Sequence, residues 1–192
     1  IDVWVNSNAD SVELLLNGKK LGMKTMPRNG HLQWDVTYAP GTLEAIGYKK
    51  GRILKAKVET TGAPAEIVLT PYKTTMIANG KDIAVLNVSI IDREGREVSN
   101  ANNMIRFRIK GPGKIIGVGN GDPSSHEPDK CPDGAWQRSV FNGKCQVIVQ
   151  SEKEAGMIEF EAYSPGLWSG STDIVTVPVK NLEPVTLDPT YI

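Results

Sequence analysis

The loop formed by residues 119–136 holds the densest group of side chains in this sequence that could bind a ligand or a metal ion. It contains Asn120, Asp122, His126, Glu127, Asp129, Asp133 and Trp136 among Pro and Gly residues. Amides and carboxylates hydrogen-bond sugar hydroxyls, and an indole ring stacks on the apolar face of a sugar. One interpretation is therefore a sugar site, with Asn120, Asp122, His126 and Trp136 as its ligand-binding candidates.

A metal ion is the second interpretation of the same loop. Oxygen ligands suit calcium, which makes Asp122, Glu127 and Asp129 the candidates, but their spacing matches no EF-hand loop. Zinc has less support, because His126 and Cys131 are only two candidates and a structural zinc site has four ligands. A long surface loop, in which Asn-Gly-Asp-Pro only turns the chain, is the remaining alternative. No cofactor is expected.

The glutamates show no arrangement typical of glycoside hydrolysis. A retaining mechanism needs two carboxyl groups about 5 Å apart in a sugar-sized pocket, one of them kept protonated. The residues considered are Glu13, Glu44, Glu59, Glu66, Glu94, Glu97, Glu159 and Glu161. Nearly all of them fall among polar, outward-facing neighbours and are expected to be solvated. Because the only histidines are His31 and His126, a nucleophile–base pair is also poorly supported. We expect no hydrolysis by this chain alone.

The four tryptophans and two cysteines allow several roles. Trp34 lies on an apolar strand face and is expected in a core. Trp136 and Trp168 lie near loops, where each is either a platform for a sugar or a cover for a sandwich end or an interface. Cys145 is expected as a small buried residue, whereas Cys131 lies in a loop rich in Pro and Asp. A disulfide between the two cysteines is one of the states that the sequence allows.

The composition excludes several functional classes. With 22 basic and 22 acidic residues, the formal net charge is zero, which gives no long-range attraction to nucleic acid or anionic lipid. The longest apolar runs have only a few residues, far short of the roughly 20 that span a bilayer. The N-terminus lacks a basic region and an apolar signal core. We therefore expect an excised piece of a longer protein, whose cellular address is encoded upstream.

Apolar alternation recurs at short intervals along the chain, and no helical stripe lasts three turns. The strands expected first are 3–6, 12–16, 32–38, 42–48, 53–59 and 66–69, and the later ones are 74–78, 83–91, 104–110, 114–118, 146–150, 157–162 and 173–177. The pattern predicts an all-β chain of two tandem immunoglobulin-like β-sandwiches, 1–71 and 72–180, with a C-terminal tail at 181–192. A single larger sandwich is the structural alternative.

A hairpin is predicted at Asn17-Gly18, two residues that tolerate the positive φ of a two-residue turn. On the strand before it, Val12, Leu14 and Leu16 share one face. Leu15 then lies on the opposite, outward face, where an apolar side chain is unusual. We expect Leu15 and Trp4 to face a neighbouring domain.

Several segments resemble parts of one enzyme family. Val-Glu-Leu-Leu-Leu-Asn-Gly-Lys-Lys-Leu-Gly (12–22), Trp-Asp-Val-Thr-Tyr-Ala-Pro-Gly-Thr-Leu-Glu-Ala (34–45) and Thr-Thr-Gly (60–62) resemble the domain after the catalytic barrel in bacterial glycoside hydrolase family 2 β-galactosidases. Asn-Gly-Lys-Asp-Ile-Ala-Val-Leu-Asn-Val-Ser-Ile-Ile-Asp (79–92), Gly-Pro-Gly-Lys-Ile-Ile-Gly-Val-Gly-Asn-Gly-Asp-Pro (111–123) and Phe-Asn-Gly (141–143) are similar to the last domain of these enzymes.

The resemblance implies two non-catalytic domains of a β-galactosidase-like enzyme. Its two catalytic glutamates would lie on a (β/α)₈ barrel, for which this chain has no alternating βα pattern. The domains would support that barrel, loop 119–136 would lean on it, and substrate access would be shaped by their loops. The resemblance also implies a periplasmic or secreted bacterial protein. The alternatives are an autonomous carbohydrate-binding module and an adhesin-like spacer, because the last domain also resembles immunoglobulin-like repeats of bacterial surface proteins.

Overall fold

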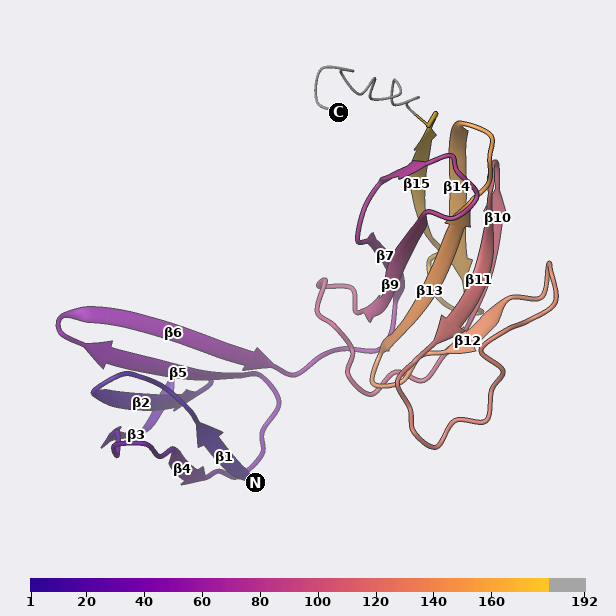
Figure 1. Cartoon of the computed structure of the whole chain (residues 1–192). Helices are drawn as coiled ribbons and strands as arrows, with labels where there is room; N and C mark the ends of the chain where they lie inside the picture. The colour runs from indigo at the N-terminus through magenta and orange to yellow at the C-terminus, as the bar shows by residue number, and fades with distance from the viewer. Residues whose placement is uncertain (180–192) are drawn as a thin grey trace, which may run out of the picture. The chain divides into compact units, whose positions relative to one another are not determined.

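The hairpin predicted at Asn17-Gly18 is present in the computed structural model, which describes residues 1–179 (Figure 1). Asn17 and Gly18 have φ angles of 51° and 78°, as the turn requires. The turn joins β2 (Ser11–Leu16) to β3 (Lys19–Thr25). With β5 (Thr42–Lys49) and β6 (Arg52–Glu59), these strands form a four-stranded sheet of order β3-β2-β5-β6.

A two-stranded sheet accompanies this larger sheet and completes the first compact unit, which ends at Thr61. It pairs β1 (Asp2–Val5) with β4 (Leu32–Asp35). The buried core between them consists of Ala9, Val12, Leu14, Leu32, Trp34 and Val36. Trp34 is therefore a core residue, as predicted.

The second unit begins at Gly62 and is a sandwich of two larger sheets (Figure 1). One sheet has the order β11-β13-β9-β7, and the other has the order β12-β10-β14-β15-β8. The strands are β7 (Glu66–Pro71), β8 (Thr75–Ile77), β9 (Ile83–Ile91), β10 (Met104–Lys110), β11 (Gly113–Gly119), β12 (Gln137–Ser139), β13 (Lys144–Ser151), β14 (Gly156–Tyr163) and β15 (Gly170–Val177). Every pair is antiparallel except β8 with β15. The predicted tandem of immunoglobulin-like sandwiches is confirmed.

The core of the second unit follows the two-residue period of its strands. Ile105 and Phe107 on β10 are buried, whereas Arg106 and Arg108 are exposed, as the sequence predicts. The opposing sheet contributes Leu86, Val88, Val147 and other residues to the same apolar cluster. All described secondary structure is strand, and residues 1–179 include no helix long and apolar enough to cross a membrane.

The predicted domain boundary at residue 71 is wrong. The chain divides between Thr61 and Gly62, because β7 hydrogen-bonds to β9 along its whole length. Ile67 on β7 is 1% exposed and packs in the second core. This pairing joins residues about twenty positions apart, which local alternation does not reveal. The predicted tail, 181–192, lies outside the described residues.

Glu13, on the outward face of β2, is not solvated as predicted. This carboxylate is buried, with only 7% of the residue exposed, and it binds Lys20 Nζ at 2.9 Å and the Tyr48 hydroxyl at 3.4 Å. Side chains from the neighbouring strands cover it, so the expectation of a solvated group is wrong. Leu15 is half-buried, and Trp4 is 60% exposed and stacked on His31. Their contact with a neighbouring domain stays a prediction.

Asp92 fastens the first residue of the second unit to the turn after β9. Its Oδ2 accepts hydrogen bonds from Gly62 N and Arg96 Nε, each at 2.8 Å, and its Oδ1 accepts from the backbone N–H groups of Glu94 and Arg96. Burial alone would raise the pKa of this carboxyl. The hydrogen bonds outweigh burial and lower the pKa to about 2.

Asp92 should therefore make the second unit sensitive to acid. A carboxyl whose pKa falls from 3.8 to about 2 on folding stabilises the folded state above the unfolded pKa, and this contribution is lost as the pH drops from 3.8 toward 2. Asp92→Asn should lower the urea midpoint at pH 7 and flatten its decline below pH 4. Asp173→Asn, at an exposed position on β15, is the control. An equally steep decline in D92N and wild type would contradict this role.

Candidate functional site

One buried guanidinium, that of Arg138 on β12, organises the loop that the sequence singled out. Arg138 is 4% exposed. Its Nη1 donates to Glu127 O and to Asp129 Oδ1, both at 2.9 Å, and its Nη2 donates to Asn120 Oδ1 at 3.0 Å. Three parts of the loop thus converge on a single side chain. Arg138 lies outside the loop, so the residue types within the loop do not reveal this network.

The remaining polar atoms of the loop add to the same network. Glu127 Oε2 accepts from Ser139 N at 2.8 Å and lies 3.8 Å from Arg138 Nε. Asn120 Nδ2 donates to Ser139 O at 3.0 Å. Both side chains therefore bind the short strand β12 on the other side of the loop, and they hold the loop in one conformation.

Among the described residues, the structure does not bring the calcium or zinc candidates together around one centre. Glu127 and Asp129 bind Arg138, while Asp122 accepts bonds from Ser124, and these bonds lower the pKa of its carboxyl. Nowhere in 1–179 do three His, Cys, Asp or Glu side chains gather in a way that could hold a metal ion. Two of the calcium candidates, Glu127 and Asp129, instead lie on the guanidinium of Arg138, and the third, Asp122, closes a turn with Ser124.

The loop is also no sugar platform at Trp136. Trp136 is 8% exposed and belongs to the core, and its carbonyl accepts a bond from Phe107 N at 2.9 Å. His126 and Asp133 are exposed, and His126 Nδ1 lies 2.9 Å from Ser124 O. Trp136 already pairs with β10 through its backbone bond from Phe107, so its side chain packs inside the sandwich although the loop before it is rich in polar residues.

The allowed disulfide between Cys131 and Cys145 is not formed, since both are free cysteines. Cys145 is 3% exposed within the core, and burial raises the pKa of its thiol to about 12. Cys131 is partly buried and packs against the edge of the same core. Cys145 is therefore the small buried residue that the sequence predicted.

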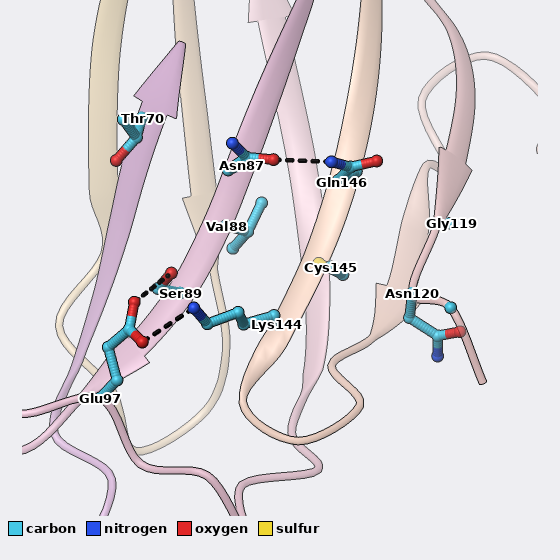
Figure 2. Close-up of a pocket in the computed structure, with 11 residues that line it drawn as sticks. Thr70, Asn87, Val88, Ser89, Glu97, Gly119, Asn120, Lys144, Cys145 and Gln146 are labelled. Carbon is cyan, nitrogen blue, oxygen red and sulfur yellow. Dashed lines mark hydrogen bonds and ion pairs between the residues drawn. The ribbon is translucent and has the colours of Figure 1, made fainter. Parts of the chain in front are cut away.

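A polar hollow of about 630 Å³ lies on the outer face of the sheet that contains β7, β9 and β13 (Figure 2). Gln146 Nε2 donates to Asn87 Oδ1 at 2.7 Å across the two strands. Glu97 binds Lys144 Nζ at 2.8 Å and Ser89 Oγ at 3.4 Å. Asn120 lines the hollow on the side opposite Glu97 (Figure 2). None of the other ligand-binding candidates of the loop is among the lining residues.

The described lining of this hollow lacks the pair of carboxyl groups that glycoside cleavage needs. Glu97 is the only carboxylate among its described lining residues, and Lys144 neutralises it. A glycoside-cleaving site needs two carboxyl groups, one of which carries a proton. The hollow can offer hydrogen bonds from amides, a hydroxyl and an ion pair, without a group that attacks or protonates a glycosidic bond.

Trp168 is the aromatic candidate that the structure leaves exposed. It is 64% exposed and lines a second hollow, of about 390 Å³, formed by other loops of the same unit. The structure thus separates Asn120, Trp136 and Trp168, and no single site unites the predicted ligand-binding residues.

Comparison with known proteins identifies the family. Residues 67–173 match the model described as glycoside hydrolase family 2 C-terminal domain 5, and residues 1–55 match a domain of unknown function, DUF4982. The chain belongs to glycoside hydrolase family 2. The matched ranges fall on either side of the boundary at residue 62, so each unit of this family 2 chain corresponds to its own conserved domain.

Individual relatives agree with this assignment. The chain is 39% identical, over 87% of its length, to the β-galactosidase BoGH2A of Bacteroides ovatus, and it spans 20% of that enzyme. It is 29% identical, over 92% of its length, to a β-glucuronidase of Formosa agariphila, of which it spans 18%. A solved family 2 structure from Bacteroides cellulosilyticus superposes with a TM-score of 0.86 at 32% identity, covering 92% of this chain and 23% of that one.

These comparisons confirm the resemblance read from the sequence. The chain is an accessory C-terminal region of a family 2 glycosidase, and its described residues contain no helix and hence no (β/α)₈ barrel. Its relatives are bacterial.

The Arg138 network predicts a specific loss of order. Arg138→Met should lower the free energy of unfolding by about 1–3 kcal/mol, because the partly buried oxygens of Asn120 and Glu127 lose a charged donor. It should also open residues 119–136 to limited proteolysis. Arg106→Met, at an exposed position on β10, is the control and should change neither measurement appreciably. An R138M loop as protease-resistant as that of wild type would show that Arg138 does not organise it.

Proposed function

We propose that this chain belongs to a β-galactosidase-like enzyme, in which a catalytic barrel hydrolyses terminal β-galactosides and these two domains support it and shape substrate access. The observation that carries the proposal is the 39% identity to the Bacteroides ovatus β-galactosidase along 87% of the chain. A β-glucuronidase is the second candidate activity, favoured by the Formosa agariphila relative at 29% identity.

The first domain carries a surface suited to such a supporting role. In the register of the sheet, Leu43 lies opposite Val58 and Gly47 lies opposite Leu54, so β6 continues the apolar face that buries Val12 and Leu14. Yet Leu54 is 48% exposed and Val58 is 65% exposed. The two-stranded sheet β1-β4 is too small to cover the β6 end of this face.

An uncovered apolar face on an edge strand favours association with another surface. The rest of the enzyme is the occupant that we propose, since the chain spans only about a fifth of the relatives' length. In this proposal, the barrel and other domains complete the core that the small sheet leaves open. The contact predicted for Leu15 is a separate proposal, because Leu15 lies on the opposite face of the sheet, and the contact predicted for Trp4 also stays a proposal.

A periplasmic or secreted location is also proposed, on the basis of the resemblance to bacterial family 2 enzymes. Fractionation of the source cells tests it, and recovery of the enzyme in the cytoplasm would overturn it. An adhesin-like spacer is less favoured, because residues 67–173 match a glycoside hydrolase domain. No nucleic-acid partner is proposed for a chain of zero formal charge.

Val58→Asn tests the supporting role. It should leave the melting temperature of the isolated 192-residue chain nearly unchanged, since Val58 is 65% exposed there, and it should lower that of the full-length enzyme by several degrees. Ile53→Asn is the matched control, because Ile53 is 61% exposed but lies on the opposite face of β6. Equal melting temperatures for V58N and wild type in the full-length enzyme would contradict the proposed contact.

A further inference from the structure

Trp168 presents an exposed aromatic ring on a backbone that is held in place. Its N–H donates to Ala65 O at 2.9 Å, and its carbonyl accepts from Ile67 N at 3.0 Å. These bonds form a parallel bridge between Glu66 and Trp168, next to the edge strand β7. The indole is nevertheless 64% exposed. Because the backbone is already ordered, only the side chain loses freedom when a ligand stacks on it.

The hollow beside this ring has walls of different chemistry. It has a volume of about 390 Å³ and is lined by residues 62–65, Arg93, Glu94, Gly166 and Trp168. This volume lies near the lower end of the range for small-ligand pockets, about 300–1,000 Å³. Trp168 therefore forms an aromatic wall, residues 62–65 form a wall of small residues, and Arg93 and Glu94 form a charged wall.

The charged wall is held by the same carboxylate that fastens the start of the unit. Asp92 accepts hydrogen bonds from both Gly62 N and Glu94 N, and it thereby joins two sides of the hollow. Glu94 Oε2 accepts a bond from Arg96 Nη2 at 2.9 Å. Arg93 forms no ion pair with any described residue, so its guanidinium can donate to a ligand. The wall thus offers both a hydrogen-bond donor and an acceptor.

We propose that this hollow binds one pyranose unit of a glycan. The apolar face of the sugar ring would stack on Trp168, while its hydroxyls would bond to Arg93 and Glu94. Pyranosides match this combination, because one face of the ring is largely C–H and its edge carries hydroxyls that both donate and accept. The larger hollow of Figure 2 has no aromatic residue among its lining, so it lacks the stacking surface.

This proposal goes beyond the supporting role and does not depend on which sugar the enzyme hydrolyses. It assigns to the second domain a glycan contact of its own. Deletion of the β6 contact would leave it intact, because every residue of the hollow belongs to the second unit.

Saturation-transfer NMR on the 192-residue chain tests the proposal, with methyl β-galactopyranoside, methyl β-glucopyranoside and methyl β-glucuronide as separate probes. We expect saturation of ring protons in at least one probe, with millimolar affinity. Trp168→Ala should weaken that binding about tenfold, whereas Trp168→Phe should retain part of it. Trp4→Ala is the matched control, since Trp4 is 60% exposed in the first unit, and it should bind like wild type.

Each contrary result would overturn the proposal. Absence of saturation transfer with all three probes would do so, as would equal affinities in W168A and wild type. If W168A lowers the melting temperature of the full-length enzyme while sugar binding is unchanged, Trp168 contacts protein instead. Arg93→Ala separates the polar wall from the ring, because it should weaken binding without changing the melting temperature of the chain.

Discussion

The alternation of side chains along β9 is the constraint on which the second domain depends. Ala84, Leu86, Val88 and Ile90 are all at most 1% exposed, while Asn87 and Ser89 between them line the polar hollow. Since β9 also pairs with both β7 and β13, a shift of one residue would turn apolar groups outward in the middle of the sheet. The core and the hollow therefore lie on opposite faces of the same strand.

Local patterns were enough to predict much of this architecture. Alternation located β9 and β10, Asn17-Gly18 located the first hairpin, and Trp34 was assigned to the core. What failed depends on residues distant in sequence. β7 is assigned to the second domain by its pairing with β9, and Glu13 is buried by Tyr48, 35 residues away. No local period carries such information.

The candidate site shows the same division. Trp136 and the loop carboxylates are of residue types that are common in binding sites. The three-residue strand β12 follows Trp136 and turns it inward, and Arg138 on that strand pairs with Glu127 and Asp129. Trp168 lies in an equally polar setting and remains exposed, because its backbone bonds hold it at a sheet edge. Composition identified the aromatic residues that matter, and long-range backbone pairing decided which of them faces solvent.

These family 2 domains accompany a catalytic centre without containing one. Hydrolysis of 4-nitrophenyl β-galactoside and 4-nitrophenyl β-glucuronide, measured side by side for the purified chain and the full-length enzyme, tests this most directly. We expect turnover by the full-length enzyme on one of the two substrates and none above the blank by the chain. Turnover by the purified chain that is abolished by Glu97→Gln, the only carboxylate in the described lining of the larger hollow, would contradict it.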